Sequence, residues 1–203
     1  MILTETGEIG VHVGSNVHVL RPSLYAMTQI GEPAQIVEVY ATVMCDGLQG
    51  KAALDQFADA LAVINACSEE DLSEVFGSYG DDLEYRPGAA PREHVLPLAR
   101  CLLRHGITGD QAPLPRKADE DPEYIREFVA RDHVALAMAH LGISEREAWG
   151  MTMTSLVGAL RAKFPRMESS APGSRAPSKE EHDATMEWFE RIEAKRRARL
   201  GSH

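Results

Sequence analysis

The chain has 203 residues, of which 44% are hydrophobic and 26% are charged, and its formal net charge is −10. This composition is normal for a globular protein with one ordinary core, and no apolar run approaches the ~20 residues needed to cross a membrane. Residues 166–203 hold eight Lys/Arg and seven Asp/Glu, which leaves a charge of −11 on residues 1–165. Because phosphate contacts need a positive surface, we expect protein partners, and neither nucleic acid nor a membrane.

Three cysteines, Cys45, Cys67 and Cys101, are widely spaced and form no CxxC pair. We therefore expect reduced thiols in a cytoplasm. The N-terminal residues carry no basic stretch ahead of an apolar run, so we expect no secretory signal.

The first part of the chain predicts a β-hairpin followed by short helices. Residues 11–19 alternate between apolar and polar side chains around the triplet Gly14-Ser15-Asn16, a pattern typical of a hairpin. Apolar residues then recur at helical spacing, with prolines at positions that suit the first turn of a helix. The expected helices run from Pro22 to a stop at Gly31, from Pro33 through Met44, across residues 54–64, and from a cap at Ser68 and Asp71 through Phe76.

The second part predicts longer helices separated by loops. Residues 77–91 are rich in Gly, Asp and Pro, and residues 106–122 contain three prolines. We expect a loop at the first, and at the second either another long loop or a linker that marks a break between two lobes. The expected helices span residues 93–105 and 124–141. Two short helices follow, one with a capping box of Ser144 and Glu147 and one with Thr154 as its N-cap, before a stop at Pro165.

The C-terminal region predicts a linker and one more helix. Residues 166–178 are rich in Ser, Pro and Gly, which is typical of a flexible linker. Residues 179–200 predict a charged helix on which Trp188, Phe189 and Ile192 fall on one arc, a stripe that a partner could bury. The expected fold is therefore mainly α, with an N-terminal β-hairpin and a helical bundle in residues 1–165, followed by the linker and the C-terminal helix.

No residue pattern points to catalysis or to a cofactor. His12 and His18 face each other if the hairpin turn has three residues, but no carboxylate or cysteine at ligand spacing completes a metal site. His133 and His140 share one helix face, where partly buried, hydrogen-bonded imidazoles are the simpler interpretation. We therefore expect no bound metal.

Residues 47–51 (Gly-Leu-Gln-Gly-Lys) lack the spacing of a phosphate-binding loop and the Ser/Thr that follows its lysine. The carboxylate runs at residues 81–82, 119–121 and 180–181 predict solvated acidic surface rather than an acid/base pair. Since no Ser, Cys or Thr lies in a nucleophile motif either, we expect a protein that is not an enzyme and has neither catalytic nor cofactor-binding residues.

The sequence Leu141-Gly-Ile-Ser144 between two expected helices also resembles the turn of a helix-turn-helix motif. In that interpretation the second helix would face DNA, but it begins with Glu145, Arg146 and Glu147, which present two acidic groups and one basic group to phosphates. A small DNA-binding regulator is therefore an alternative, and a corner between packed helices explains the same residues.

Two segments resemble the tail assembly chaperones of long-tailed bacteriophages and related prophages. The first is the hairpin leading into Leu20-Arg-Pro-Ser-Leu-Tyr-Ala-Met27 and a helix ending at Ile30-Gly31. The second runs from Leu141-Gly-Ile-Ser144 through Trp149 to Met153-Thr-Ser-Leu156.

The resemblance implies a non-enzymatic, mostly helical factor made in the cytoplasm of the bacterial host and absent from the mature virion. Its implied partners are the tape-measure protein and the tail-tube protein, and self-association is compatible with it. A structural virion component at the head–tail junction is a further alternative. The residues expected to contact partners, each with burial in the core as its alternative, are Leu24, Met27, Trp149, Met153, Trp188, Phe189 and Ile192.

Overall fold

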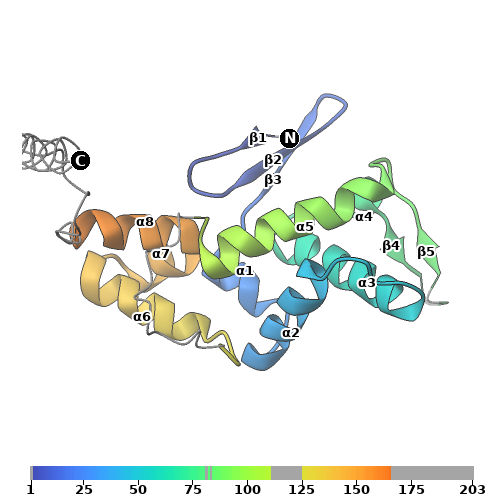
Figure 1. Cartoon of the computed structure of the whole chain (residues 1–203). Helices are drawn as coiled ribbons and strands as arrows, with labels where there is room; N and C mark the ends of the chain where they lie inside the picture. Colours follow the sequence, from blue (N-terminus) through green and yellow to red (C-terminus); the bar gives the residue numbers. More distant parts are fainter. Residues whose placement is uncertain (1, 81, 83, 111–124, 166–203) are drawn as a thin grey trace, which may run out of the picture. The chain divides into compact units, whose positions relative to one another are not determined.

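The chain begins with a small antiparallel sheet. A computed structural model describes residues 2–80, 82, 84–110 and 125–165, and in it three strands pair in the order β1-β2-β3 (Figure 1). They are β1 (Ile2–Leu3), β2 (Ile9–Val13) and β3 (Asn16–Leu20). The β2–β3 hairpin confirms the expectation from the alternating residues, whereas β1 was not expected.

The hairpin turn has two residues rather than three, because Val13 pairs with Asn16. His12 therefore lies opposite Val17, and His18 lies opposite Val11. A slip of one residue moves a side chain to the other face of a sheet, so the two histidines lie on opposite faces and do not face each other. The arrangement that would have begun a metal site is absent from this hairpin.

Four helices follow the sheet, and their starts reflect local chemistry. The Ser23 hydroxyl accepts a hydrogen bond from the Ala26 amide at 3.0 Å, which caps the first helix, and Pro33 stands in the first turn of the second. Of the two residues expected to cap the fourth helix, Asp71 bonds to its start and Ser68 does not. The Asp71 carboxylate accepts a hydrogen bond from the Ser73 amide at 2.9 Å. The four are α1 (Leu24–Thr28), α2 (Pro33–Met44), α3 (Lys51–Ala66) and α4 (Ser73–Phe76).

The expected loop at residues 77–91 contains a short two-stranded ladder, β4 (Ser78–Tyr79) with β5 (Tyr85–Arg86). The helix expected at residues 93–105 is present, but it is irregular at both ends. It consists of the 3₁₀ turn η1 (Arg92–His94), α5 (Val95–Leu103) and the π-helical turn η2 (Arg104–Thr108).

Three helices complete the described chain: α6 (Ala130–Leu141), α7 (Glu145–Gly150) and α8 (Met153–Lys163). The first of them starts later than expected, because residues 125–129 carry no regular structure. Gly142 ends α6 in the left-handed conformation at φ +70°, and the predicted capping box of Ser144 and Glu147 is present. The helix expected to begin at Thr154 is instead capped by Thr152, whose hydroxyl accepts from the Ser155 amide at 3.1 Å.

The helices pack around one core to which the sheet also contributes. Helix α3 packs chiefly on α5, whereas α6 packs on α7 and α1, and α8 on η2. Residues on both sides of 111–124 belong to one compact unit, Met1–Lys163, so the expected lobe break at residues 106–122 does not divide it. The largest fully buried side chains are Leu20, Leu24, Met27, Ile36, Val43, Ile64, Leu72, Phe76, Leu98, Leu102, Leu103 and Leu156.

A mainly α fold with an N-terminal hairpin is thus confirmed. A second unit begins at Phe164, and the linker and helix expected at residues 166–178 and 179–200 lie outside the described residues. The expected contact residues Trp188, Phe189 and Ile192 lie outside them as well.

Candidate functional site

Three of the expected contact residues are buried in the core. Leu24 and Met27 are 0% exposed and Met153 is 5% exposed, so the expectation that they lie at the surface is wrong. The first two share one side of α1 because residues three apart lie on the same helix face, and this side faces the interior. Their role is packing, which was the stated alternative for each.

Trp149 does lie at the surface, and it meets an aromatic partner that was not expected. The rings of Trp149, on α7, and Tyr25, on α1, make an edge-to-face contact with centroids 6.5 Å apart and planes at 89°. Tyr25 is 58% exposed and Trp149 is half-buried. The Trp149 indole N–H donates to the Glu145 carboxylate at 3.2 Å, which fixes the orientation of the ring.

The ring pair stands between two hollows in the surface. One, of about 710 Å³, lies between α1, the end of α3 and α7. The other, of about 730 Å³, shares Tyr25, Arg146 and Trp149 with it and extends toward Thr28 and Glu145. We call the two together the Tyr25–Trp149 groove. It is lined by Arg21, Ser23, Tyr25, Ala26, Thr28, Gln29, residues 65–69, Ser144, Glu145, Arg146, Trp149 and Gly150.

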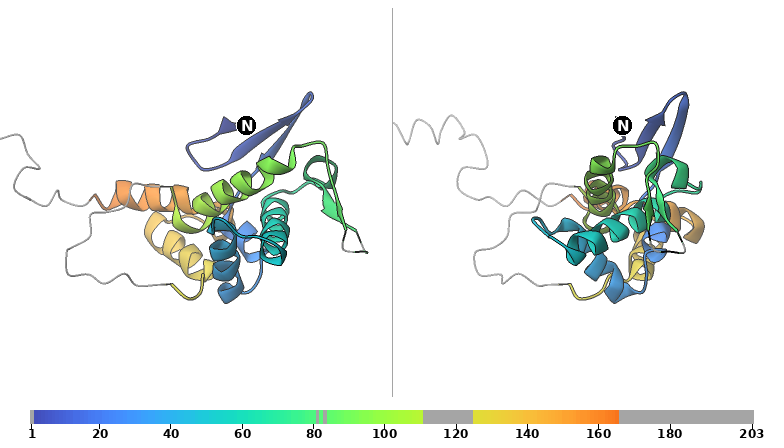
Figure 2. Two further views of the ribbon diagram at one scale, coloured as in Figure 1. Left: turned by 45° about the vertical axis from the view of Figure 1, so that its right-hand side comes forward. Right: turned by 90° about the vertical axis from the view of Figure 1, so that its right-hand side faces the viewer.

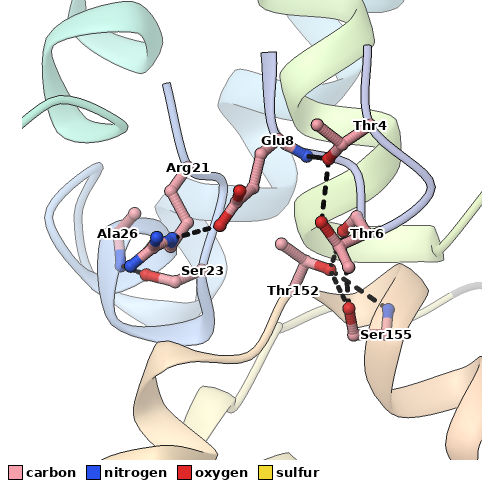
Figure 3. A network of polar contacts seen from close by, with 8 residues as sticks. All are labelled: Thr4, Thr6, Glu8, Arg21, Ser23, Ala26, Thr152 and Ser155. Atoms are coloured by element: carbon pink, nitrogen blue, oxygen red, sulfur yellow. Dashed lines mark hydrogen bonds and ion pairs between the residues drawn. The ribbon is translucent and has the colours of Figure 1, made fainter. Parts of the chain in front are cut away.

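Beside the groove, a polar network surrounds Thr152, whose hydroxyl contacts Thr6 and Ser155 (Figure 3). Ser23 and Thr152 form an isolated antiparallel bridge, and the Leu24 amide donates to the Met151 carbonyl at 2.8 Å. These contacts join the start of α1 to the segment between α7 and α8. The Thr152 hydroxyl also donates to the Thr6 carbonyl, so the turn between β1 and β2 is tied to the same point.

Charges are unevenly distributed along the groove. Arg21 is held by Glu8, with Nε 2.5 Å from the carboxylate, whereas Arg146 is exposed and makes no ion pair with the described residues. Hydrogen bonds from the Ser144 hydroxyl and amide hold the pKa of Glu147 below its usual value, so this carboxylate serves as a helix cap. The groove therefore combines an apolar ring pair with one basic side chain available to a ligand.

Thr154, the expected helix cap, belongs instead to a buried polar cluster. Its hydroxyl lies 2.8 Å from His105 Nδ1 and accepts from the Asp110 amide at 3.1 Å. The Asp110 carboxylate is 3.9 Å from His105 Nε2, so a hydroxyl, an imidazole and a carboxylate occur together. Thr154 is 5% and His105 is 4% exposed, whereas the Asp110 side chain lies at the surface and is 62% exposed. The pKa of His105 is lowered from its usual value, chiefly because the ring is buried.

Neither of the expected helix histidines, at positions 133 and 140, joins a metal site. His133 stacks on Phe128 with ring centroids 5.1 Å apart, and its pKa is lowered chiefly by burial. Of the acidic runs, Asp82 pairs with Arg86 at 3.4 Å, while residues 81, 119–121 and 180–181 lie outside the described chain. Within that described chain, no group of three or more His, Cys, Asp or Glu side chains could hold a metal ion.

Residues 47–51 mark the start of α3, where Gly50 adopts φ +58°, as expected for a helix start. Among the helices that the structure describes, none combines the length and apolar character needed to span a bilayer.

The fold and the groove thus define a class: a mainly α protein with an aromatic-walled surface fixed by interhelical hydrogen bonds. The chain belongs to a family of unknown function, DUF6246, whose model matches residues 20–184. The match includes every residue that lines the Tyr25–Trp149 groove. Comparison with curated proteins gave no match, and comparison with solved structures gave none either.

Proposed function

We propose that the protein is a non-enzymatic tail assembly chaperone, which binds a tape-measure protein and recruits tail-tube subunits around it. The observation that carries the proposal is the Tyr25–Trp149 groove. An amphipathic helix binds by placing side chains from one face into an apolar groove, and exposed Tyr and Trp side chains provide large contact areas at low cost in conformational entropy. The resemblance of residues 20–31 and 141–156 to tail assembly chaperones supplies the identity of the partner.

The ring pair and the net charge of the molecule fit such a partner. A tape-measure protein exposes long amphipathic helices, which need an apolar surface to cover them and an acidic, soluble exterior around it. The ring pair offers the first, and the net charge of −11 on residues 1–165 offers the second. Under this proposal the protein works in the cytoplasm of the bacterial host and is absent from the mature virion.

The test is co-expression of the full chain with the candidate partners, followed by pull-down. The gene neighbourhood is inspected first, and the product of any very long, coiled-coil-rich reading frame next to the gene for this protein is the candidate tape measure. The Trp149→Ala and Tyr25→Ala chains should retain less of it than the unaltered chain. Tyr79→Ala is the matched control, because Tyr79 is also a solvent-exposed tyrosine (36%) and lies on β4, away from the groove.

The outcomes separate clearly. Retention of the tape measure that falls with the two groove variants and not with the control supports the proposal. Failure of the unaltered chain to retain either the tape measure or the tail tube contradicts it. Detection of the protein in purified virions would favour a structural component at the head–tail junction.

The DNA-binding alternative has weaker support. Helix α7 has only six residues, its first residue is Glu145, and Glu147 is engaged in the helix cap. Arg146 is the single basic side chain among its leading residues. Binding of the chain to duplex DNA with an affinity that falls steeply as salt increases would support the regulator.

A further inference from the structure

Two side chains of opposite charge line the Tyr25–Trp149 groove without meeting each other. Glu69, which follows the end of α3, and Arg146, on α7, both line the hollow of about 710 Å³, and both are exposed. Neither forms an ion pair with the other or with any other residue that the structure describes. An anion and a cation that share one hollow in this way are available to a ligand that lies between them.

The other charged side chains of the groove are already engaged. Arg21 is paired with Glu8, at 2.5 Å between its Nε and the carboxylate (Figure 3). Glu145 accepts the indole N–H of Trp149 at 3.2 Å. Among the charged residues that line the two hollows of the groove, the pair described above therefore remains for recognition of a partner.

The two available charges lie toward opposite ends of the groove. Helix α1, which carries Tyr25, lies between α3 and α7 and contacts both (Figure 2). A smaller hollow of about 280 Å³ beside β3 is lined by Glu69 and not by Arg146. The hollow on the far side of the ring pair is lined by Arg146 and not by Glu69. The negative charge is thus nearer the hairpin, and the positive charge is nearer α7 and the rings.

We propose that the groove selects an amphipathic helix whose apolar face is flanked by one basic and one acidic side chain. The apolar face contacts the rings of Tyr25 and Trp149, the acidic side chain pairs with Arg146, and the basic side chain pairs with Glu69. This inference rests on the proposed function, which supplies a helix as the ligand, and adds the charge pattern of that helix. Hollows of this size hold small molecules, so they receive side chains while the helix lies across them.

Charge complementarity favours this partner over helices of a single charge. Residues 1–165 carry a net charge of −11, which by itself would attract a helix with basic side chains only. Arg146 opposes such a helix beside the rings, whereas Glu69 opposes a helix with acidic side chains only. Like charges placed together at an interface disfavour wrong partners, so the mixed pattern is the one that both residues accept.

Three synthetic helical peptides test the charge pattern on the full chain. Each has about 18 residues, or about five turns, a fluorescent label and the same apolar face of leucines. Beside this face the mixed peptide carries Lys at one end and Glu at the other, the basic peptide carries Lys at both ends, and the acidic peptide carries Glu at both. Fluorescence anisotropy at low ionic strength, where exposed charges are least screened, gives a dissociation constant for each.

Reversing one charge of the groove should change which peptide is preferred. Arg146→Glu should raise the affinity for the basic peptide, relative to the mixed peptide, by at least about fivefold, because one repulsive contact becomes attractive and one attractive contact becomes repulsive. Its control is Arg131→Glu, at an exposed arginine of α6, which gives the chain the same net charge. Glu69→Lys should favour the acidic peptide over the mixed one by a similar factor, with Glu38→Lys, at an exposed site on α2, as its control.

Preferences that change in the groove variants and not in their controls support the proposal. Equal changes in variant and control overturn it, because only the net charge of the chain would then matter. Failure of the unaltered chain to bind the mixed peptide at millimolar concentration also overturns it. Circular dichroism establishes that each variant is folded, and all four substitutions are at exposed positions.

The same variants distinguish this inference from the proposed function. If pull-down of the tape measure decreases with Trp149→Ala but is unchanged by Arg146→Glu and by Glu69→Lys, the proposed function stands and the charge pattern is overturned. If the peptide preferences change as expected but the unaltered chain retains no tape measure, the charge pattern is supported and the role in tail assembly is contradicted.

Discussion

The guanidinium of Arg100, on α5, donates at 2.7 Å to the carbonyl oxygen of Cys45, at the end of α2. The same side chain donates to the Val43 carbonyl at 2.8 Å and pairs with the Asp46 carboxylate at 2.8 Å. The last carbonyls of a helix have no partner within the helix, and a positive charge at this end is favourable. Arg100 therefore fixes the end of α2 against α5 by donating to carbonyl groups that have no partner within the helix.

Gln56 should matter for stability because it supports the same helix end from α3. Its amide donates to the carbonyls of Thr42 and Cys45 at 2.8 and 2.7 Å, and the side chain is 7% exposed. We expect Gln56→Leu to lower the free energy of unfolding by about 1–3 kcal/mol, since buried carbonyls lose a donor. Urea denaturation measures this. Gln29→Leu, at an exposed glutamine, is the control, and an equal loss there would contradict the explanation.

Gly7 and Gly14 form a matched pair for a second prediction. Both have positive φ, +87° and +60°, so alanine at either position has the same type of backbone strain, about 1–2 kcal/mol. A Cβ on Gly7 would lie 2.8 Å from the His105 ring, whereas one on Gly14 meets nothing within 4 Å. We therefore expect Gly7→Ala to lower the melting temperature more than Gly14→Ala. Equal shifts would mean that the turn does not pack tightly on His105.

Protonation of His105 should reduce stability in mild acid. Because burial lowers its pKa in the folded state, the unfolded chain binds more protons, and the free energy of unfolding falls as the pH decreases below about 6.5, the ordinary value. His133 contributes in the same direction. Urea titrations between pH 8 and pH 5 should show a smaller slope for His105→Asn than for the unaltered chain. An unchanged slope for His105→Asn would contradict the assignment.

Thr152 should be the residue that holds the β1–β2 turn on α8. The variant Thr152→Val removes the helix cap and the hydrogen bond to the Thr6 carbonyl, at an expected cost of about 1–3 kcal/mol. Hydrogen exchange should increase at residues 4–8 more than in α2. Thr28→Val, whose hydroxyl donates to the Tyr25 carbonyl and accepts from the Gln29 side chain, should not produce this pattern. Uniformly faster exchange in the Thr152 variant would indicate global destabilisation instead.

Leu24 and Tyr25 are adjacent in sequence, but substituting Leu24 should reduce stability whereas substituting Tyr25 should reduce partner binding. Leu24→Ala opens a cavity in the core and should lower the free energy of unfolding by about 2–5 kcal/mol. Tyr25→Ala removes an exposed ring and should change stability by less than about 1 kcal/mol, while reducing partner retention. Denaturation curves and pull-downs on the same preparations separate the two effects. A large loss of stability in Tyr25→Ala would place that ring in the core.

Local chemistry made much of the helical structure predictable. Pro33 in a first turn, the capping box of Ser144 and Glu147, and Gly142 at a helix end each depend on residues within a few positions of one another. The choice between Thr152 and Thr154 as the cap of α8 could not be made in this way. Both are threonines at the start of an apolar helix. The Thr154 hydroxyl is not the cap because it contacts His105, which comes from a distant part of the chain.

Of the two rings that form the groove, only Trp149 could be predicted from the sequence. Trp149 stood out as a tryptophan between two helix starts, but its contact with Tyr25 depends on the pairing of Ser23 with Thr152, which no local pattern encodes. The hairpin histidines were misplaced for a related reason. A turn of two residues instead of three is a small difference in sequence, but it reverses which side chains share a face.

The hydrogen bond between Thr6 and Thr152 spans 146 positions of the chain, and this separation sets an order of events during synthesis. The helix start that holds the N-terminal turn leaves the ribosome only after almost all of the Met1–Lys163 unit has been made. Closing so long a loop costs more entropy than forming the local helices. Residues 4–8, although they precede the rest of this unit in the chain, are therefore among its last parts to reach their final place.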